Sequence, residues 1–167
     1  MKRLRNPART GFPTRIGILI LVGALITAAT ALAATPPLGA RMGYTNWNSQ
    51  DQIHVGGHVK LGDILPNVAF TPGLELGFGS GMKVLTLNGD LYYRATEFAQ
   101  KHWQPYVGGS VSLNHANFDH GSETDLGLSA LIGTTRALNS GNELLVEIRL
   151  GLIDSPGLKL TAGITFF

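Results

Sequence analysis

The sequence predicts an all-β protein: an eight-stranded antiparallel up-and-down β-barrel that crosses a membrane and follows an N-terminal signal-peptide helix. Three observations predict this fold. Apolar residues alternate with small or polar residues in segment after segment beyond residue 37, and a period of two is typical of strands. Only 14% of the 167 residues are charged, whereas roughly 25% is usual for soluble globular domains. The first 33 residues have the composition of an export signal.

The N-terminal segment combines basic residues with an apolar run. Residues 1–33 hold five of the 13 Lys and Arg residues and none of the 11 Asp and Glu residues, and the uncharged run 16–34 contains the small residues Ala31 and Ala33. This pattern indicates a secretory signal peptide, with a retained membrane anchor as the alternative. We therefore expect a signal peptide over residues 1–33 and a barrel domain over residues 34–167. The barrel domain has a net negative charge, which argues against nucleic acid as a partner.

Turn-forming residues, namely Gly, Pro, Asn, Asp and Ser, separate the alternating segments from one another. The expected strands are residues 38–47, 53–61, 68–78, 85–94, 103–114, 125–133, 146–152 and 158–166. No cysteine is present, so disulfides and thiolate metal sites are excluded.

The first four strands each place isolated charges or imidazoles among small residues on the polar face. The first strand has Arg41 there, the third has Glu75 and the fourth has Asp90. In the second strand, His54 and His58 share the polar face about 13 Å apart, which is too far to bind one metal ion. We expect these histidines to fill the barrel interior.

The last four strands follow a less regular stretch. Residues 95–102 are the least strand-like and could hold a helical turn. The fifth strand alternates over about twelve residues, and the polar residues 115–122 after it are expected to form a loop. Leu131 is the exception to alternation in the sixth strand. The last strand alternates up to the aromatic pair Phe166 and Phe167.

The composition of the polar face indicates which face of the strands points into the barrel and which points outward. Closure pairs every strand edge, and the apolar face could point inward, as in a soluble lipocalin-like barrel, or outward to lipid. The polar face consists of Gly, Ser, Thr and Asn with about one charge per strand, which is too few charges for a solvated surface. We therefore expect it to line the lumen of a membrane barrel with a balanced polar network. The charged members are Arg41, Lys60, Glu75, Asp90, Arg94, Asp125, Glu147, Arg149 and Lys159.

Aromatic residues stand near the expected strand ends. With both termini in the periplasm, Trp47 and Phe78 fall at the outer ends of their strands, and Tyr93, Trp103 and Phe166 fall at the periplasmic ends. Two such aromatic girdles are typical of membrane barrels, because these rings favour the membrane–water interface.

The C-terminal hairpin carries a resemblance to a known group of proteins. Together with the signal peptide and the alternating strands, Leu144-Leu-Val-Glu-Ile-Arg-Leu-Gly-Leu152 and Asp154-Ser-Pro-Gly-Leu-Lys-Leu-Thr-Ala-Gly-Ile-Thr-Phe-Phe167 resemble the small outer-membrane barrels of Gram-negative bacteria, the OmpA-like and opacity-type porin-like group. The resemblance implies Sec-type export, a monomer in outer-membrane lipid, and assembly by the barrel assembly machinery. In this group the terminal aromatic, here Phe167, belongs to the assembly signal.

Fold alone does not give function, so three hypotheses stay open. The first is a non-enzymatic structural barrel or at most a narrow pore, because side chains fill an eight-stranded interior. The second is a lipid A-modifying enzyme. Ile153-Asp-Ser155 stands where deacylase-like barrels have a His-x-Ser pair, which leaves one nearby combination of suitable residue types: His115, Asp119, His120 and Ser122. The third is adhesion or ligand binding through the loop 115–122. We expect the first, with no catalytic residues, cofactor or metal.

Overall fold

The computed structural model describes residues 36–47, 49–79, 81–118 and 121–167, so the expected signal peptide lies outside the described residues. This part contains the strands β1 (Leu38–Trp47), β2 (Gln50–Val59), β3 (Asp63–Leu65), β4 (Val68–Gly79), β5 (Met82–Arg94), β6 (Trp103–Phe118), β7 (Gly121–Ala137), β8 (Glu143–Ile153) and β9 (Leu158–Phe166), and the short 3-10 helix η1 (Thr96–Phe98). No helix in the described ranges is long and apolar enough to cross a bilayer.

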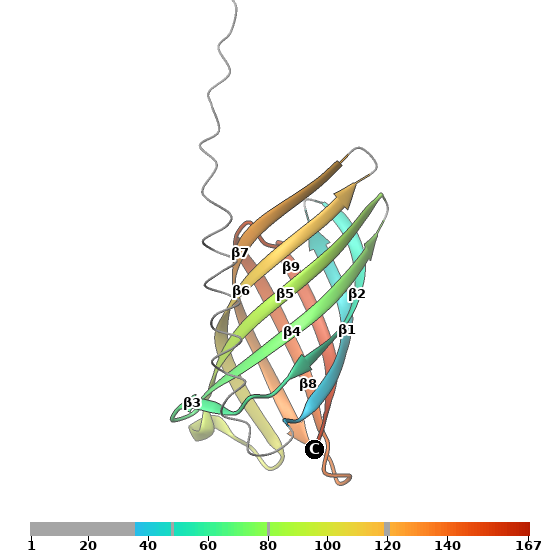
Figure 1. The fold of residues 1–167 in the computed structure, drawn as a ribbon. Coiled ribbons are helices and arrows are strands. Elements are labelled where there is room, and N and C mark those ends of the chain that lie inside the picture. The colour runs from blue at the N-terminus through green and yellow to red at the C-terminus, as the bar shows by residue number, and fades with distance from the viewer. Residues whose placement is uncertain (1–35, 48, 80, 119–120) are drawn as a thin grey trace, which may run out of the picture. The chain divides into compact units, whose positions relative to one another are not determined.

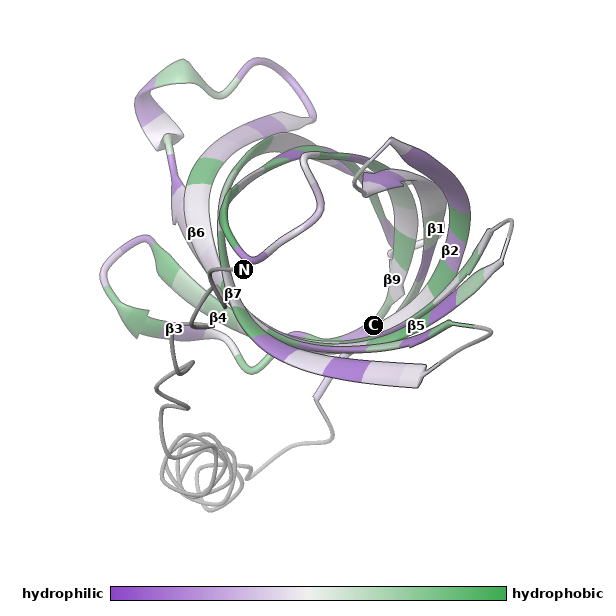
Figure 2. Cartoon of the chain, turned by 90° about the horizontal axis from the view of Figure 1, so that it is seen from above, coloured by the Kyte–Doolittle hydropathy of each residue, from purple (hydrophilic) through white to green (hydrophobic). Residues whose placement is uncertain are grey.

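Eight of these strands close into an antiparallel barrel (Figures 1 and 2). β1 pairs with both β2 and β9, which closes the ring, and β2 pairs with β4 past the short β3. β3 pairs only with Val68 and Ala69 at the start of β4, beyond the reach of β2. The predicted eight-stranded up-and-down barrel is therefore confirmed, and closure leaves the ring without the unpaired edges of an open sheet.

The barrel has two different ends. At one end, which we call the hairpin end, the connections from β1 to β2, β4 to β5, β6 to β7 and β8 to β9 are all short. The opposite end, the terminal end, holds the start of β1, the end of β9 and the longer connections 60–67, 95–102 and 138–142 (Figure 1). The helical turn expected within residues 95–102 is present there as η1.

The segment 115–122 differs from its prediction. β6 continues to Phe118, β7 begins at Gly121, and these strands stay paired up to Asn117 opposite Ser122 and Phe118 opposite Gly121. The predicted polar loop is therefore wrong: the segment forms a long hairpin, in which residues 119–120 lie outside the described residues. Alternating hydropathy cannot reveal this part of the strands, because both of their faces are largely polar here.

Apolar side chains cover the outside of the barrel, and polar side chains predominate inside it. Outward-facing aliphatic residues are strongly exposed, among them Met42 at 59%, Leu74 at 51% and Leu150 at 50%. Inward-facing neighbours such as Arg41 at 3% and Glu75 at 2% are buried. This is the reverse of the arrangement that water stabilises, since burial of apolar surface is what drives a soluble chain to fold. The outward direction of the apolar face thus agrees with the membrane alternative.

Candidate functional site

Six buried charged side chains form a continuous series of ion pairs inside the barrel, which we call the ion chain. None of these side chains is more than 5% exposed. Cations and carboxylates alternate along the ion chain, which runs through Lys159, Glu75, Arg41, Asp90, Arg149 and Glu147.

The ion chain connects strands that are not neighbours in the ring. Arg41 of β1 places its Nε 2.7 Å from Oε1 of Glu75 on β4, and its Nη1 3.1 Å from Oδ2 of Asp90 on β5. Lys159 of β9 pairs with the second oxygen of Glu75. Arg149 of β8 places Nη2 3.0 Å from Oδ2 of Asp90. Because these pairs reach past intervening strands, they cross the lumen and bring opposite walls together.

Neutral donors complete the coordination of the carboxylates. Ser110 Oγ donates to Oδ1 of Asp90 at 2.5 Å, and the phenol of Tyr92 donates to Oδ2 at 3.1 Å. The phenol of Tyr106 donates to Oε2 of Glu147 at 3.0 Å. Both carboxylates therefore have charged and neutral donors, as buried charges require in order to be tolerated.

The lumen between the ion chain and the hairpin end is filled. Trp47 packs there against a buried cluster of Met82, Val84 and Ala116. The turn between β8 and β9 folds inward: Pro156 is buried, and the Asn114 side-chain amide donates to the carbonyl of residue 154 at 3.2 Å. A small void of about 10 Å³ lies next to Trp47 and Pro156. In the described residues, packed side chains and an inward-folded turn therefore narrow the lumen at this end.

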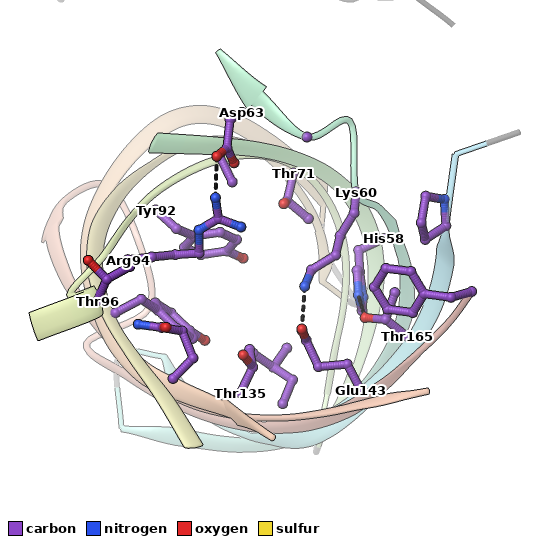
Figure 3. A pocket seen from close by; sticks show the side chains of 17 residues that line it. His58, Lys60, Asp63, Thr71, Tyr92, Arg94, Thr96, Thr135, Glu143 and Thr165 are labelled. Atoms are coloured by element: carbon purple, nitrogen blue, oxygen red, sulfur yellow. Dashed lines mark hydrogen bonds and ion pairs between the residues drawn. The ribbon is translucent and has the colours of Figure 1, made fainter. Parts of the chain in front are cut away.

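The terminal end holds a much larger cavity of about 430 Å³. Two ion pairs border it, Lys60 with Glu143 and Arg94 with Asp63 (Figure 3). Its walls combine hydroxyl groups with aromatic and aliphatic carbon. Other residues that line the cavity include Ala69, Thr71, His58, Thr165, Tyr92, Tyr106, Thr135, Leu145 and Phe167.

The charged residues singled out from the sequence thus fall into three places. Six of them form the ion chain. Lys60 and Arg94 lie at the terminal end, where their partners are the carboxylates Glu143 and Asp63 rather than members of the predicted network. Asp125 lies half-buried in β7 opposite Asn114.

Four of the five aromatics expected in girdles face outward. Phe78 is exposed at the hairpin end, and Tyr93, Trp103 and Phe166 are exposed near the terminal end. Trp47 instead lies on the inner face of β1, the face that also carries Arg41 and Thr45, and this explains its packing inside the lumen. Phe167, which follows β9, is 71% exposed.

The lumen also holds bulky side chains, on a face otherwise made of small ones. Tyr92 and Tyr106 lie with ring centroids 4.8 Å apart and pack with Leu131 and Leu145 in a buried apolar cluster. Leu131 was visible as an exception to alternation, and its inward position accounts for that exception. Strict alternation along β5 and β6 places both tyrosines on the polar face, but it does not indicate that they pack together.

The histidines have ordinary hydrogen-bond partners. His54 Nε2 lies 3.1 Å from Thr161 Oγ1, and His58 Nε2 lies 2.9 Å from Thr165 Oγ1. In the hairpin, His115 Nδ1 lies 2.7 Å from Thr124 Oγ1. Ser122 pairs across the strands with Asn117. Asp119 and His120, the other members of the hypothetical catalytic group, lie outside the described residues.

Comparison with solved structures shows the same fold. The crystal structure of Neisserial surface protein A (NspA) matches with a TM-score of 0.57 and 18% identity, covering 77% of this chain and 93% of that chain. The crystal structure of the outer membrane enzyme PagL matches with a TM-score of 0.51 and 11% identity, covering 78% of this chain and 99% of that chain. No family model and no curated protein sequence matches the chain. At these identities the likeness extends to the fold alone, that of small outer-membrane β-barrels.

Proposed function

We propose that the chain is a non-enzymatic integral barrel of the bacterial outer membrane whose lumen is closed, so that it acts as a structural element of the membrane and not as an open pore. The main support for this proposal is that the barrel has an apolar exterior and a lumen whose charged side chains are paired with one another. Water would stabilise the opposite arrangement, whereas lipid favours this one. The fold shared with NspA and PagL supports the same location.

The sequence supports further details of this function, namely the route of export, the family, the oligomeric state and the assembly signal. Residues 1–33 act as a signal peptide for Sec-type export, and residues 34–167 form the membrane domain. The barrel belongs to the OmpA-like and opacity-type group, is a monomer, and has outer-membrane lipid as its surroundings. Phe167 contributes to recognition by the barrel assembly machinery, and its exposure at the end of the chain is compatible with this role.

Closure of the lumen follows from the ion chain and the packed hairpin end. An eight-stranded barrel has an interior just wide enough for side chains. Here the ion chain crosses that interior, and the cluster around Trp47 fills the space beyond it. A conducting path would require several buried pairs to separate together.

Two measurements test this proposal. The purified barrel should migrate differently on a detergent gel before and after boiling, since closed barrels resist unfolding by detergent, and it should fractionate with outer membranes. In planar bilayers it should produce no steady channel steps. Recovery of the protein from the soluble periplasmic fraction, or steady conductance of a size that needs an open lumen, would overturn the location or the closure respectively.

The enzyme alternative has weaker support. PagL shows that this fold can carry an enzyme, but in the described part of the hairpin the imidazole of His115 pairs with Thr124 and not with a serine. The third alternative, binding through the β6–β7 hairpin, retains one favourable observation. Residues 121–127 of β7 extend beyond the first residue paired with β8, so the hairpin projects past its neighbour.

A further inference from the structure

The cavity at the terminal end is much larger than the small void beside Trp47. It is not needed to close the barrel. The ion chain and the hairpin-end cluster occupy the interior beyond it. Its volume of about 430 Å³ falls within the range of roughly 300–1,000 Å³ typical of small-molecule sites. The cavity lies at the terminal end, which faces the periplasm if both termini lie there.

Two buried polar atoms in residues that line the cavity have no hydrogen-bond partner among the described residues. They are Oγ1 of Thr71 and Nδ1 of His58, in side chains that are 1% and 4% exposed. Figure 3 shows both residues among those that line the cavity. Buried polar atoms in folded proteins are nearly always paired, because an unmade hydrogen bond costs about 1–3 kcal/mol. The hydrogen-bonding capacity of these two groups is therefore unused in the unliganded protein.

The charges around the cavity are already compensated. Lys60 pairs with Glu143, and Arg94 pairs with Asp63, so each border cation has its own carboxylate. The ion chain beneath is also internally balanced. A charged ligand would have to lose its hydration without gaining an unpaired counter-charge, which is unfavourable.

The neutral groups on the wall define what would fit. The phenols of Tyr92 and Tyr106 already donate their protons to Asp90 and Glu147, which leaves their oxygens as acceptors. Together with Thr71 and His58 they present several hydrogen-bonding positions beside the aromatic rings. Leu145, Ala69 and Phe167 supply apolar wall.

We propose that this cavity binds an uncharged small molecule with hydroxyl groups on one side and an apolar face on the other, such as a glycoside of a small aromatic alcohol. The hydroxyl groups bond to Thr71, His58 and the phenol oxygens, and the apolar face packs on the rings. This binding activity goes beyond the proposed structural role, which does not require a ligand.

The test titrates phenyl β-D-glucoside into the folded mature barrel in lipid nanodiscs and follows heat release by calorimetry, with anionic phenyl phosphate as the comparison. The glucoside should bind saturably at one molecule per barrel, and phenyl phosphate at least tenfold more weakly. Thr71→Val should weaken glucoside binding by about three- to tenfold, the value of one hydrogen bond. It should not destabilise the unliganded barrel, because the hydroxyl has no protein partner to lose.

Thr86→Val is the matched control. Thr86 lies on the neighbouring strand β5 beside the small hairpin-end void, and its hydroxyl donates to Asn114 Oδ1 at 3.0 Å. This variant should lower stability and leave glucoside affinity unchanged. Thr135→Trp, which fills the cavity, should abolish saturable binding.

Three outcomes would overturn the inference: no saturable glucoside binding, equal affinity for phenyl phosphate, or binding that Thr71→Val and Thr135→Trp leave unaltered. The boiling-dependent gel shift, recorded for every variant, separates this failure from failure of the proposed function. A barrel that is folded in lipid and binds nothing contradicts the ligand site alone.

Discussion

Glu75 shows at the scale of one residue how the lumen is held. Its carboxylate lies between Arg41 and Lys159, and its side chain is 2% exposed. Removing the charge leaves two buried cations without that partner. We therefore expect Glu75→Gln to destabilise the barrel by about 3–5 kcal/mol, with the lower value applying where water reaches the site. Urea-induced unfolding from lipid vesicles measures this loss.

Glu143 provides the matched comparison for Glu75. It also pairs with a lysine, but its side chain is 21% exposed and that of Lys60 is 26% exposed. Solvent screens such a pair, so Glu143→Gln should cost no more than about 1 kcal/mol. Equal losses for the two variants would mean that the ion chain is hydrated and does not hold the barrel walls together.

At this scale the sequence predicted which face a residue occupies better than which partner it meets. Parity placed Arg41, Glu75 and Asp90 on the inner face, where they lie buried. It did not identify Glu143 as the partner of Lys60, 83 positions away. Contacts across the lumen depend on the stagger of all the strands, and the sequence of any one strand does not contain that information.

At the scale of elements, the seam between β1 and β9 closes the ring, and it depends on close backbone approach. A Cβ added to Gly43 would lie 1.8 Å from the carbonyl oxygen of Leu160 on β9. We expect Gly43→Ala to separate the strands or shift the backbone, at a cost of about 1–3 kcal/mol. The fraction of barrel that resists unfolding on an unboiled detergent gel, together with urea titration, checks this expectation.

Gly109 of β6 serves as the control glycine. A Cβ there would meet its nearest atom, the carbonyl oxygen of Ser129, at an ordinary 3.8 Å. Gly109→Ala should be neutral or slightly stabilising, because alanine restricts the unfolded chain more than glycine does. If both substitutions behave alike, the seam is not as tight as the distances to Gly43 indicate.

Element boundaries were predictable where one face of a strand is apolar and not where both faces are polar. β1, β4 and β9 begin close to their expected positions, because one of their faces is continuously apolar. The outer parts of β6 and β7 were assigned to a loop, because backbone pairing alone continues the hairpin there. β3 was missed for a related reason, since three residues are too short for a period to show.

At the scale of the whole molecule, the central claim is that the exposed apolar exterior faces lipid. Leu74 and Leu65 test it as a pair. Leu74 is 51% exposed in the middle of β4, next to Glu75 of the ion chain, and Leu65 is 62% exposed in β3 at the terminal end. If water surrounded the barrel, both positions would tolerate arginine, because both side chains are exposed.

The free energies of unfolding of Leu74→Arg and Leu65→Arg, obtained by urea titration in lipid vesicles, show whether lipid or water surrounds the barrel. Near the bilayer midplane an arginine costs about 2–4 kcal/mol, and at the membrane edge about 0–1 kcal/mol. If the exterior faces lipid, Leu74→Arg should show the large loss and Leu65→Arg the small one. Equal tolerance of both substitutions would contradict this expectation, because the exterior of the barrel would then face water.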